Sequence, residues 1–187
     1  MHVLPTNSPA VGHFHPLMPS AQALEAAGHV VAFASLPSVG SVAEASGCRF
    51  FPVGPPAADL FSVPELQEFV SLSDPLTRRD VIRKFVTPVL LPRLILPDLM
   101  SWCDSWSPHL IVDDNYQFDG RVAAERFDIP HVTLKVGDTF GYASRYELVP
   151  PMDALRDSVG LAPDPDDAML FPLPVCARRA NGTPYRG

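Results

Sequence analysis

Apolar and polar positions near the start of the chain alternate between the spacing of helices and that of strands. Leu17, Ala21 and Leu24 recur at the helical spacing i, i+4, i+7, whereas HVVAFAS is a short apolar run rich in β-branched residues. Gly28 fits the position that follows a helix. The expected elements are strands at 2–4, 29–35 and 48–54 and helices at 16–27 and 39–46. This regular alternation predicts a parallel α/β sheet.

The same alternation of strands and helices returns after a middle region that predicts mostly helix. Residues 57–106 predict mostly helix, and a basic cluster within them has the spacing of a solvated helix face. Beyond it, strands are expected at 109–114 and 131–136 and helices at 118–127 and 152–160. Proline, glycine and polar residues throughout 166–187 predict a connector without packed elements. We therefore expect one domain at 1–165, a parallel sheet with helices on both faces, followed by a linker-like tail at 166–187.

Composition and charge narrow the classes of protein. The chain has 187 residues, 47% apolar and 19% charged, which suits one domain with a substantial core. Its net charge of −7 and the absence of a basic run argue against binding to nucleic acid. Three widely separated cysteines predict free thiols in a reducing compartment, so we expect a cytoplasmic protein.

Neither a signal peptide nor a membrane span is expected. The chain does not open with a basic segment followed by an apolar run. The most apolar long stretch, residues 86–100, is interrupted by three prolines, Arg93 and Asp98, so it predicts a buried, broken helix. Trp102 and Trp106, one helical turn apart, are expected to pack between elements.

A histidine and an aspartate a hundred residues apart are expected to meet. His13 follows the first strand and Asp114 ends the strand LIVDD, and in a parallel sheet the carboxyl ends of the strands share one edge. A carboxylate bonded to one imidazole nitrogen makes the other nitrogen a better base. Two other interpretations remain open at this point: a loop histidine without a role, and an aspartate that caps a helix. Asp113 is expected to face elsewhere.

Other motifs are weak or absent. His13 and His15 form an H-x-H pair, but no partner motif supplies further ligands, so no metal is expected. The sequence contains no phosphate loop, no G-x-G-x-x-G after the first strand and no G-x-S-x-G elbow. A dinucleotide oxidoreductase is therefore disfavoured. Asp119 and Arg121 are expected on the surface of a helix.

Aromatic residues near the same edge are candidates for an apolar binding pocket. They are Phe14, Phe140, Tyr142 and Tyr146, which lie in or after the expected loops. Such rings would suit a hydrophobic small molecule.

Two blocks of the sequence resemble the GT-B glycosyltransferases of family 1, especially the bacterial enzymes that modify antibiotics and other natural products. The first block is SPAVGHFHPLMPSAQALEAAGHVVAFAS, with the motif G-H-x-x-P at Gly12–Pro16, and the second is PHLIVDDNYQFDGRVAAERFDIPHV. LRDSVGLAPDPDD also resembles the stretch before the family's interdomain linker. The resemblance implies a Rossmann-like sheet, the N-terminal, acceptor-binding half of a GT-B fold.

The resemblance also implies roles for named residues. His13 takes the place of the general base that deprotonates an acceptor hydroxyl, and Asp114 takes the place of the aspartate that holds this histidine. His15 falls on a variable position of the motif. The implied donor is a nucleoside-diphosphate sugar, TDP- or UDP-linked, and no cofactor is implied. The implied acceptor is a small hydrophobic natural product, and a homodimer or a partner subunit stays open.

The sequence departs from the family's pattern in several places. Pro5 stands inside the first strand, which we expect to be shortened, Ser20 replaces a usual leucine, and Asp128 replaces a usual glycine. The family's proteins are about twice as long, and nothing here resembles their donor-binding half. The chain is thus expected to be a fragment, a truncated product or one part of a two-part enzyme, with a non-catalytic helper module as the alternative.

Overall fold

The computed structural model describes residues 1–8, 10–136, 145–164 and 175–178. Its centre is a six-stranded sheet in the order β3-β2-β1-β4-β5-β6. The strands are β1 (His2–Thr6), β2 (Val30–Ser35), β3 (Arg49–Pro52), β4 (Leu110–Asp114), β5 (His131–Leu134) and β6 (Val175–Arg178). β1 to β5 run parallel and β6 runs antiparallel to β5. The predicted parallel α/β sheet is confirmed.

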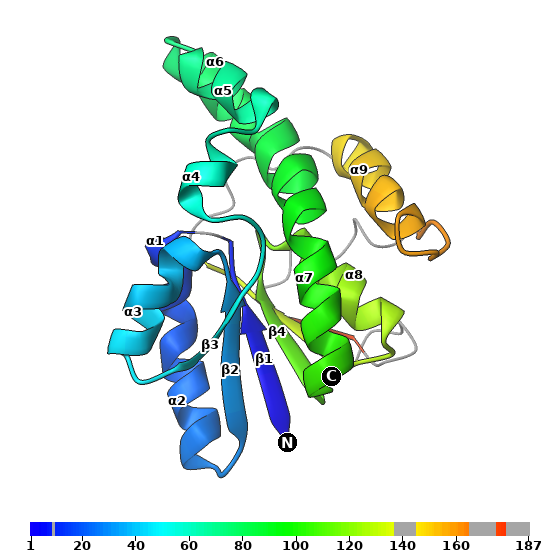
Figure 1. The fold of residues 1–187 in the computed structure, drawn as a ribbon. Helices are drawn as coiled ribbons and strands as arrows, with labels where there is room; N and C mark the ends of the chain where they lie inside the picture. Colours follow the sequence, from blue (N-terminus) through cyan, green and yellow to red (C-terminus); the bar gives the residue numbers. More distant parts are fainter. Residues whose placement is uncertain (9, 137–144, 165–174, 179–187) are drawn as a thin grey trace.

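Helices cover both faces of this sheet (Figure 1). One face carries α1 (Val11–Phe14), η1 (His15–Leu17), α2 (Met18–Ala26), η2 (Pro37–Val39) and α3 (Gly40–Ala45). The other carries α7 (Leu91–Trp106), α8 (Phe118–Arg126) and α9 (Arg145–Asp157). Gly28, with φ of +84°, follows α2 in the left-handed conformation that glycine adopts without strain.

The strands supply apolar side chains to both layers because successive residues of a strand point to opposite faces. On β1, Val3 joins the core under α2 and α3, whereas Leu4 joins the core under α7 and α8. On β4, Val112 and Ile111 divide in the same way. This double burial explains why these strands are continuously apolar and not alternating.

The middle region is helical, as predicted, and extends away from the sheet (Figure 1). It comprises α4 (Ala57–Leu60), α5 (Pro64–Ser71), α6 (Pro75–Val81) and the π-helix η3 (Ile82–Leu90), which continues into α7. Pro88 lies inside η3, where the wider π turns accommodate its missing N–H. Leu90, Ile95 and Leu99 are buried, whereas Arg93, Pro97 and Asp98 are exposed, so the predicted burial of 86–100 holds for one face of the helix. The expected break was wrong, because η3 continues directly into α7.

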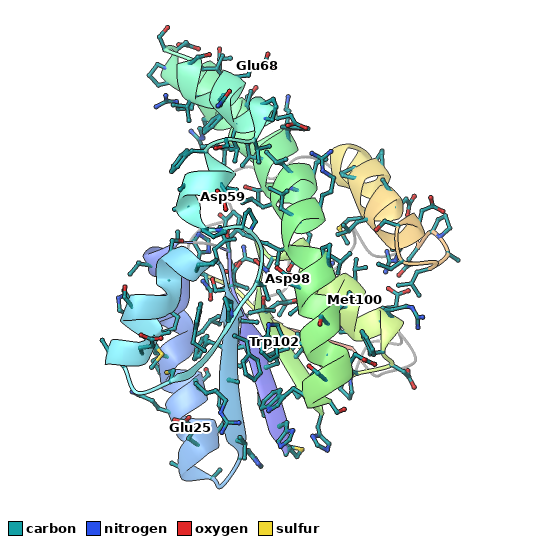
Figure 2. The ribbon with its side chains drawn as sticks, in the orientation of Figure 1. Glu25, Asp59, Glu68, Asp98, Met100 and Trp102 are labelled. Carbon is teal, nitrogen blue, oxygen red and sulfur yellow. The ribbon has the colours of Figure 1, made fainter. Side chains whose placement is uncertain are left out.

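No helix in the described part of the chain is long and apolar enough to span a bilayer. Trp102 and Trp106 pack as expected. The Trp102 ring stacks on Phe51 at 4.0 Å between ring centroids, and its Nε1 donates to the carbonyl of Pro52 at 3.1 Å. Figure 2 shows Trp102 on the side of α7 that faces the strands, while Glu68 lies on the extension formed by α5 and α6.

Two expectations about strands were wrong. Pro5 does not shorten β1: the register with β4 continues through Pro5 opposite Val112 and Thr6 opposite Asp113. A single proline removes one backbone donor and leaves its carbonyl available. The tail also contains a packed element, because Val175–Arg178 pairs with β5 as β6. The rest of 166–174 and 179–187 lies outside the described residues.

The layer around α8 and α9 differs most from the sequence-based expectation. α9 begins at Arg145, earlier than expected, and its Arg156 is fully buried in ion pairs with Glu125 and Asp164. Asp128, just after α8, has a φ of +55°. Aspartate tolerates this left-handed conformation and glycine prefers it, which explains the glycine of the resembling family at this position.

Candidate functional site

The first part of the candidate site is built by the loop between β1 and α1. β1 ends at Thr6 and α1 begins at Val11. The backbone N–H of His13 donates to the carbonyl of Ala10 at 2.8 Å, which closes the first turn of α1. This turn presents the His13 imidazole at the carboxyl edge of the sheet, with 25% of the side chain exposed. The apolar face of the following helix fixes the loop, because Leu17 and Ala21 are buried against the sheet.

Asp114 reaches the same place from β4. β4 lies next to β1 in the sheet, and Asp114 is its last residue and is fully buried. The Nδ1 atom of His13 lies 3.1 Å from Oδ2 of Asp114. The two side chains therefore meet as strand order predicted, while their catalytic roles stay a prediction.

The carboxylate of Asp114 is held in one orientation by two backbone donors. The Ser8 N–H donates to Oδ2 at 2.8 Å, and the Tyr116 N–H donates to Oδ1 at 2.6 Å. Because both oxygens accept from backbone N–H groups, we expect Nδ1 of His13 to carry the hydrogen between the two side chains. The imidazole then keeps Nε2 as its basic nitrogen, the arrangement that proton removal from a substrate requires.

Tyr116 is a site residue that the sequence did not reveal. Its ring meets the His13 ring edge-on, with centroids 4.9 Å apart and planes at 89°. Tyr116 lies two residues after Asp114 in a loop at the carboxyl edge of β4, and this position was the signal available in the sequence. The contact restricts the tilt of the imidazole beside its carboxylate partner.

Of the predicted acceptor-binding residues, the structure describes the side chain of Phe14 only. Phe14 is fully buried, with its ring 4.8 Å from that of Phe33 in the core under α2 and α3, so its assignment to an acceptor pocket was wrong. Adjacent residues of a helix point about 100° apart, so His13 faces the site and Phe14 the core. Phe140 and Tyr142 lie outside the described residues. His15 is exposed and its ring contacts Phe14.

No group of three or more metal-ligating side chains occurs within residues 1–8, 10–136, 145–164 and 175–178.

Three charged residues near the site are buried: Asp113, Asp119 and Arg121. Asp113 points away from the His13 pair, as predicted, but the surface placement of Asp119 and Arg121 was wrong. α8 contacts β4, α7 and α9, so almost its whole circumference is covered. Burial raises the pKa of Asp119 to about 8, against hydrogen bonds that lower it and with added repulsion from Asp113 and Asp114.

Asp119→Asn is expected to stabilise the protein at neutral pH. The folded chain holds a proton on Asp119 up to its pKa of about 8, whereas the unfolded chain loses this proton near the ordinary aspartate pKa of 3.8. Between these values the folded state binds the extra proton, so stability falls as pH rises, by about 1.4 kcal/mol per pH unit at most. Asparagine removes this dependence. Urea unfolding at several pH values should show a flatter profile and a gain of a few kcal/mol; an unchanged slope would contradict the buried neutral carboxyl.

Gly120→Ala is expected to destabilise the protein by about 1–3 kcal/mol, the usual range for overpacking. A Cβ at Gly120 would lie 2.7 Å from Cγ2 of Thr6 and 3.2 Å from Cβ of Asp113, both on buried strands. α8 would have to move away from the edge of the sheet. Gly12→Ala is a matched control because a Cβ there meets nothing within 4 Å. Equal unfolding midpoints for the two variants would contradict the close approach of α8.

The fold matches solved glycosyltransferases. Spinosyn forosaminyltransferase SpnP superposes with a TM-score of 0.63 and 26% identity, over 89% of this chain and 43% of that one. Spinosyn rhamnosyltransferase SpnG complexed with thymidine diphosphate superposes with a TM-score of 0.62 and 20% identity, over 86% of this chain and 42% of that one. SpnG has also been solved with the spinosyn aglycone.

Curated relatives agree with this match. Erythronolide mycarosyltransferase of Saccharopolyspora erythraea is 29% identical over 160 residues, which is 76% of this chain and 39% of the relative. L-demethylnoviosyl transferase of Streptomyces niveus is 29% identical over 73% of this chain and 35% of its own length. The chain thus spans less than two fifths of these relatives.

The family model of the Erythromycin biosynthesis protein CIII-like N-terminal domain matches residues 22–149, well over half of the chain. Together with the sheet order and the solved relatives, this match identifies the fold as the N-terminal half of a GT-B glycosyltransferase. The chain belongs to the Erythromycin biosynthesis protein CIII-like N-terminal domain family, whose relatives are antibiotic glycosyltransferases.

Proposed function

We propose that this chain is the acceptor-binding half of an inverting glycosyltransferase that transfers a deoxysugar to a hydroxyl of a small hydrophobic natural product. The observation that carries the proposal is the His13–Asp114 pair, with 3.1 Å between Nδ1 and Oδ2 and the imidazole partly exposed at the carboxyl edge of the sheet. Ligands of open parallel sheets bind at this edge.

The pair suits a general-base mechanism. Nε2 of His13 accepts the proton of the acceptor hydroxyl while the hydroxyl oxygen attacks the anomeric carbon of the sugar. The bond between that carbon and the diphosphate breaks, and the nucleoside diphosphate leaves with the electron pair. Attack opposite the leaving group inverts the anomeric carbon. Asp114 stabilises the imidazolium that forms, because its carboxylate is already oriented by Ser8 and Tyr116.

The donor is proposed to be a TDP- or UDP-linked sugar. The solved relative SpnG binds thymidine diphosphate, which favours TDP. We assign donor binding to the portion of the relatives that this chain does not cover, since the chain matches about two fifths of their length. The acceptor is proposed to be a hydrophobic aglycone, in keeping with the spinosyn aglycone bound by SpnG.

The test joins this chain to the donor-binding half of spinosyn forosaminyltransferase and supplies TDP-sugars with a panel of macrolide and aromatic aglycones. Mass spectrometry should detect a glycosylated product from the joined protein and none from the chain alone. A joined protein that binds an aglycone but forms no product, while the parent transferase is active in the same assay, would favour the helper-module alternative.

A further inference from the structure

The loop Asn115–Gln117 lies beside the carboxylate that supports His13. Its Tyr116 N–H donates to Oδ1 of Asp114, and the Gln117 N–H donates to the Asp114 carbonyl at 3.0 Å. The Tyr116 ring packs against His13 itself. Together with the Ser8 N–H, the position of this loop therefore orients the carboxylate, and its Tyr116 ring restricts the tilt of the imidazole.

The buried side chain of Gln117 holds the loop in place through two hydrogen bonds. Its side chain is almost fully buried, and its Nε2 donates to Oγ1 of Thr6 at 3.1 Å and to Oδ2 of Asp119 at 2.7 Å. Thr6 is the last residue of β1 and Asp119 lies in the first turn of α8. One amide thus joins the loop to the strand that leads to His13 and to the helix that follows Asp114.

The Gln117 side chain does not cap the helix that follows it. Gln117 occupies the N-cap of α8, yet it makes no side-chain capping bond to the helix. A capping side chain would have satisfied a free backbone N–H of the first turn. Instead, both N–H groups of the amide donate to side chains, one to Thr6 at the end of β1 and one to Asp119 in the first turn of α8.

Resting on the proposed function, we propose that Gln117 is a positioning residue that keeps Asp114 directed at Nδ1 of His13 and so selects the tautomer whose Nε2 is free to act as the base. Without the amide, the loop loses its connection to Thr6 and Asp119. The Tyr116 N–H and ring then move relative to Asp114 and His13, and the bond to Nδ1 weakens.

The tautomer of His13 is the direct readout. In the chain labelled with ¹⁵N-histidine, the Nδ1 and Nε2 resonances of the neutral imidazole report which nitrogen carries the hydrogen, and His13→Ala assigns them. We expect the hydrogen on Nδ1 in the unsubstituted chain. Gln117→Met, similar in length but without donors, should shift the tautomer ratio about fivefold toward Nε2–H, the effect of losing about one net hydrogen bond.

One control variant separates positioning from general loss of stability. Val122→Ala removes buried volume from the same helix, α8, without touching the loop, and should leave the ratio unchanged despite a lower melting temperature. An unchanged ratio in Gln117→Met, or an equal shift in Val122→Ala, would overturn the proposal. Because this measurement detects no product, such a result differs from failure of sugar transfer in the joined protein.

Discussion

Replacing His13 with alanine is expected to lower sugar transfer by about 100- to 10,000-fold, the contribution of a well-placed general base. The side chain is 25% exposed and lies at the edge of the sheet, so its removal should leave the core intact. The loss should appear in kcat more than in KM, since the imidazole acts on the proton that moves in the transition state. The measurement is product formation by the joined protein.

His15→Ala is the matched control for this experiment. His15 lies two residues away, is exposed, and has its ring against Phe14 rather than near Asp114. It should retain the activity of the unsubstituted protein. Turnover near that level in His13→Ala, with the circular dichroism spectrum unchanged, would reject His13 as the base.

Asp114→Asn is expected to reduce transfer by about as much as the loss of the aspartate in a catalytic triad, up to about 10,000-fold. The geometry explains why an isosteric change is so severe. If the amide oxygen replaces Oδ2, it still accepts from Ser8 and His13, but the amide nitrogen then faces the Tyr116 N–H, which now lies 2.6 Å from Oδ1. The asparagine NH₂ group and the Tyr116 N–H, both hydrogen-bond donors, would then face each other.

The opposite orientation of the asparagine is no better. Its nitrogen would then face Nδ1 of His13, and the imidazole would have to accept there and carry its hydrogen on Nε2, where the base is needed. In either orientation the imidazolium formed during transfer lacks an anionic partner. Kinetics of the joined protein should show a fall in kcat, with a moderate loss of stability from the buried mismatch. Activity close to that of the unsubstituted protein would show that the carboxylate is dispensable.

Much of the site followed from the sequence because parallel sheets obey a simple rule of direction. The apolar runs located β1 and β4, and the carboxyl ends of parallel strands share one edge. That rule brought His13 and Asp114 together across 101 positions of sequence. The periodicity of Leu17 and Ala21 likewise identified the buried face of η1 and α2.

The sequence could not reveal how many layers cover each helix. α8 carries Asp119 and Arg121 at positions that a helix with one buried face would expose, but α7 and α9 enclose it from both sides. Periodicity indicates which residues share a face and does not count the neighbours of that face. Burial then raised the pKa of Asp119 to about 8, a property with no signal in the local sequence.

The sequence by itself determined the parallel α/β fold and the meeting of His13 with Asp114, since both depend on strand direction and apolar spacing. The tertiary structure alone decided that Phe14 belongs to the core, that Tyr116 contacts the imidazole and that Gln117 joins the loop to Thr6 and Asp119. Each of these depends on the direction of a side chain relative to elements distant in sequence. Such directions are set by packing between layers, which no local pattern of residues encodes.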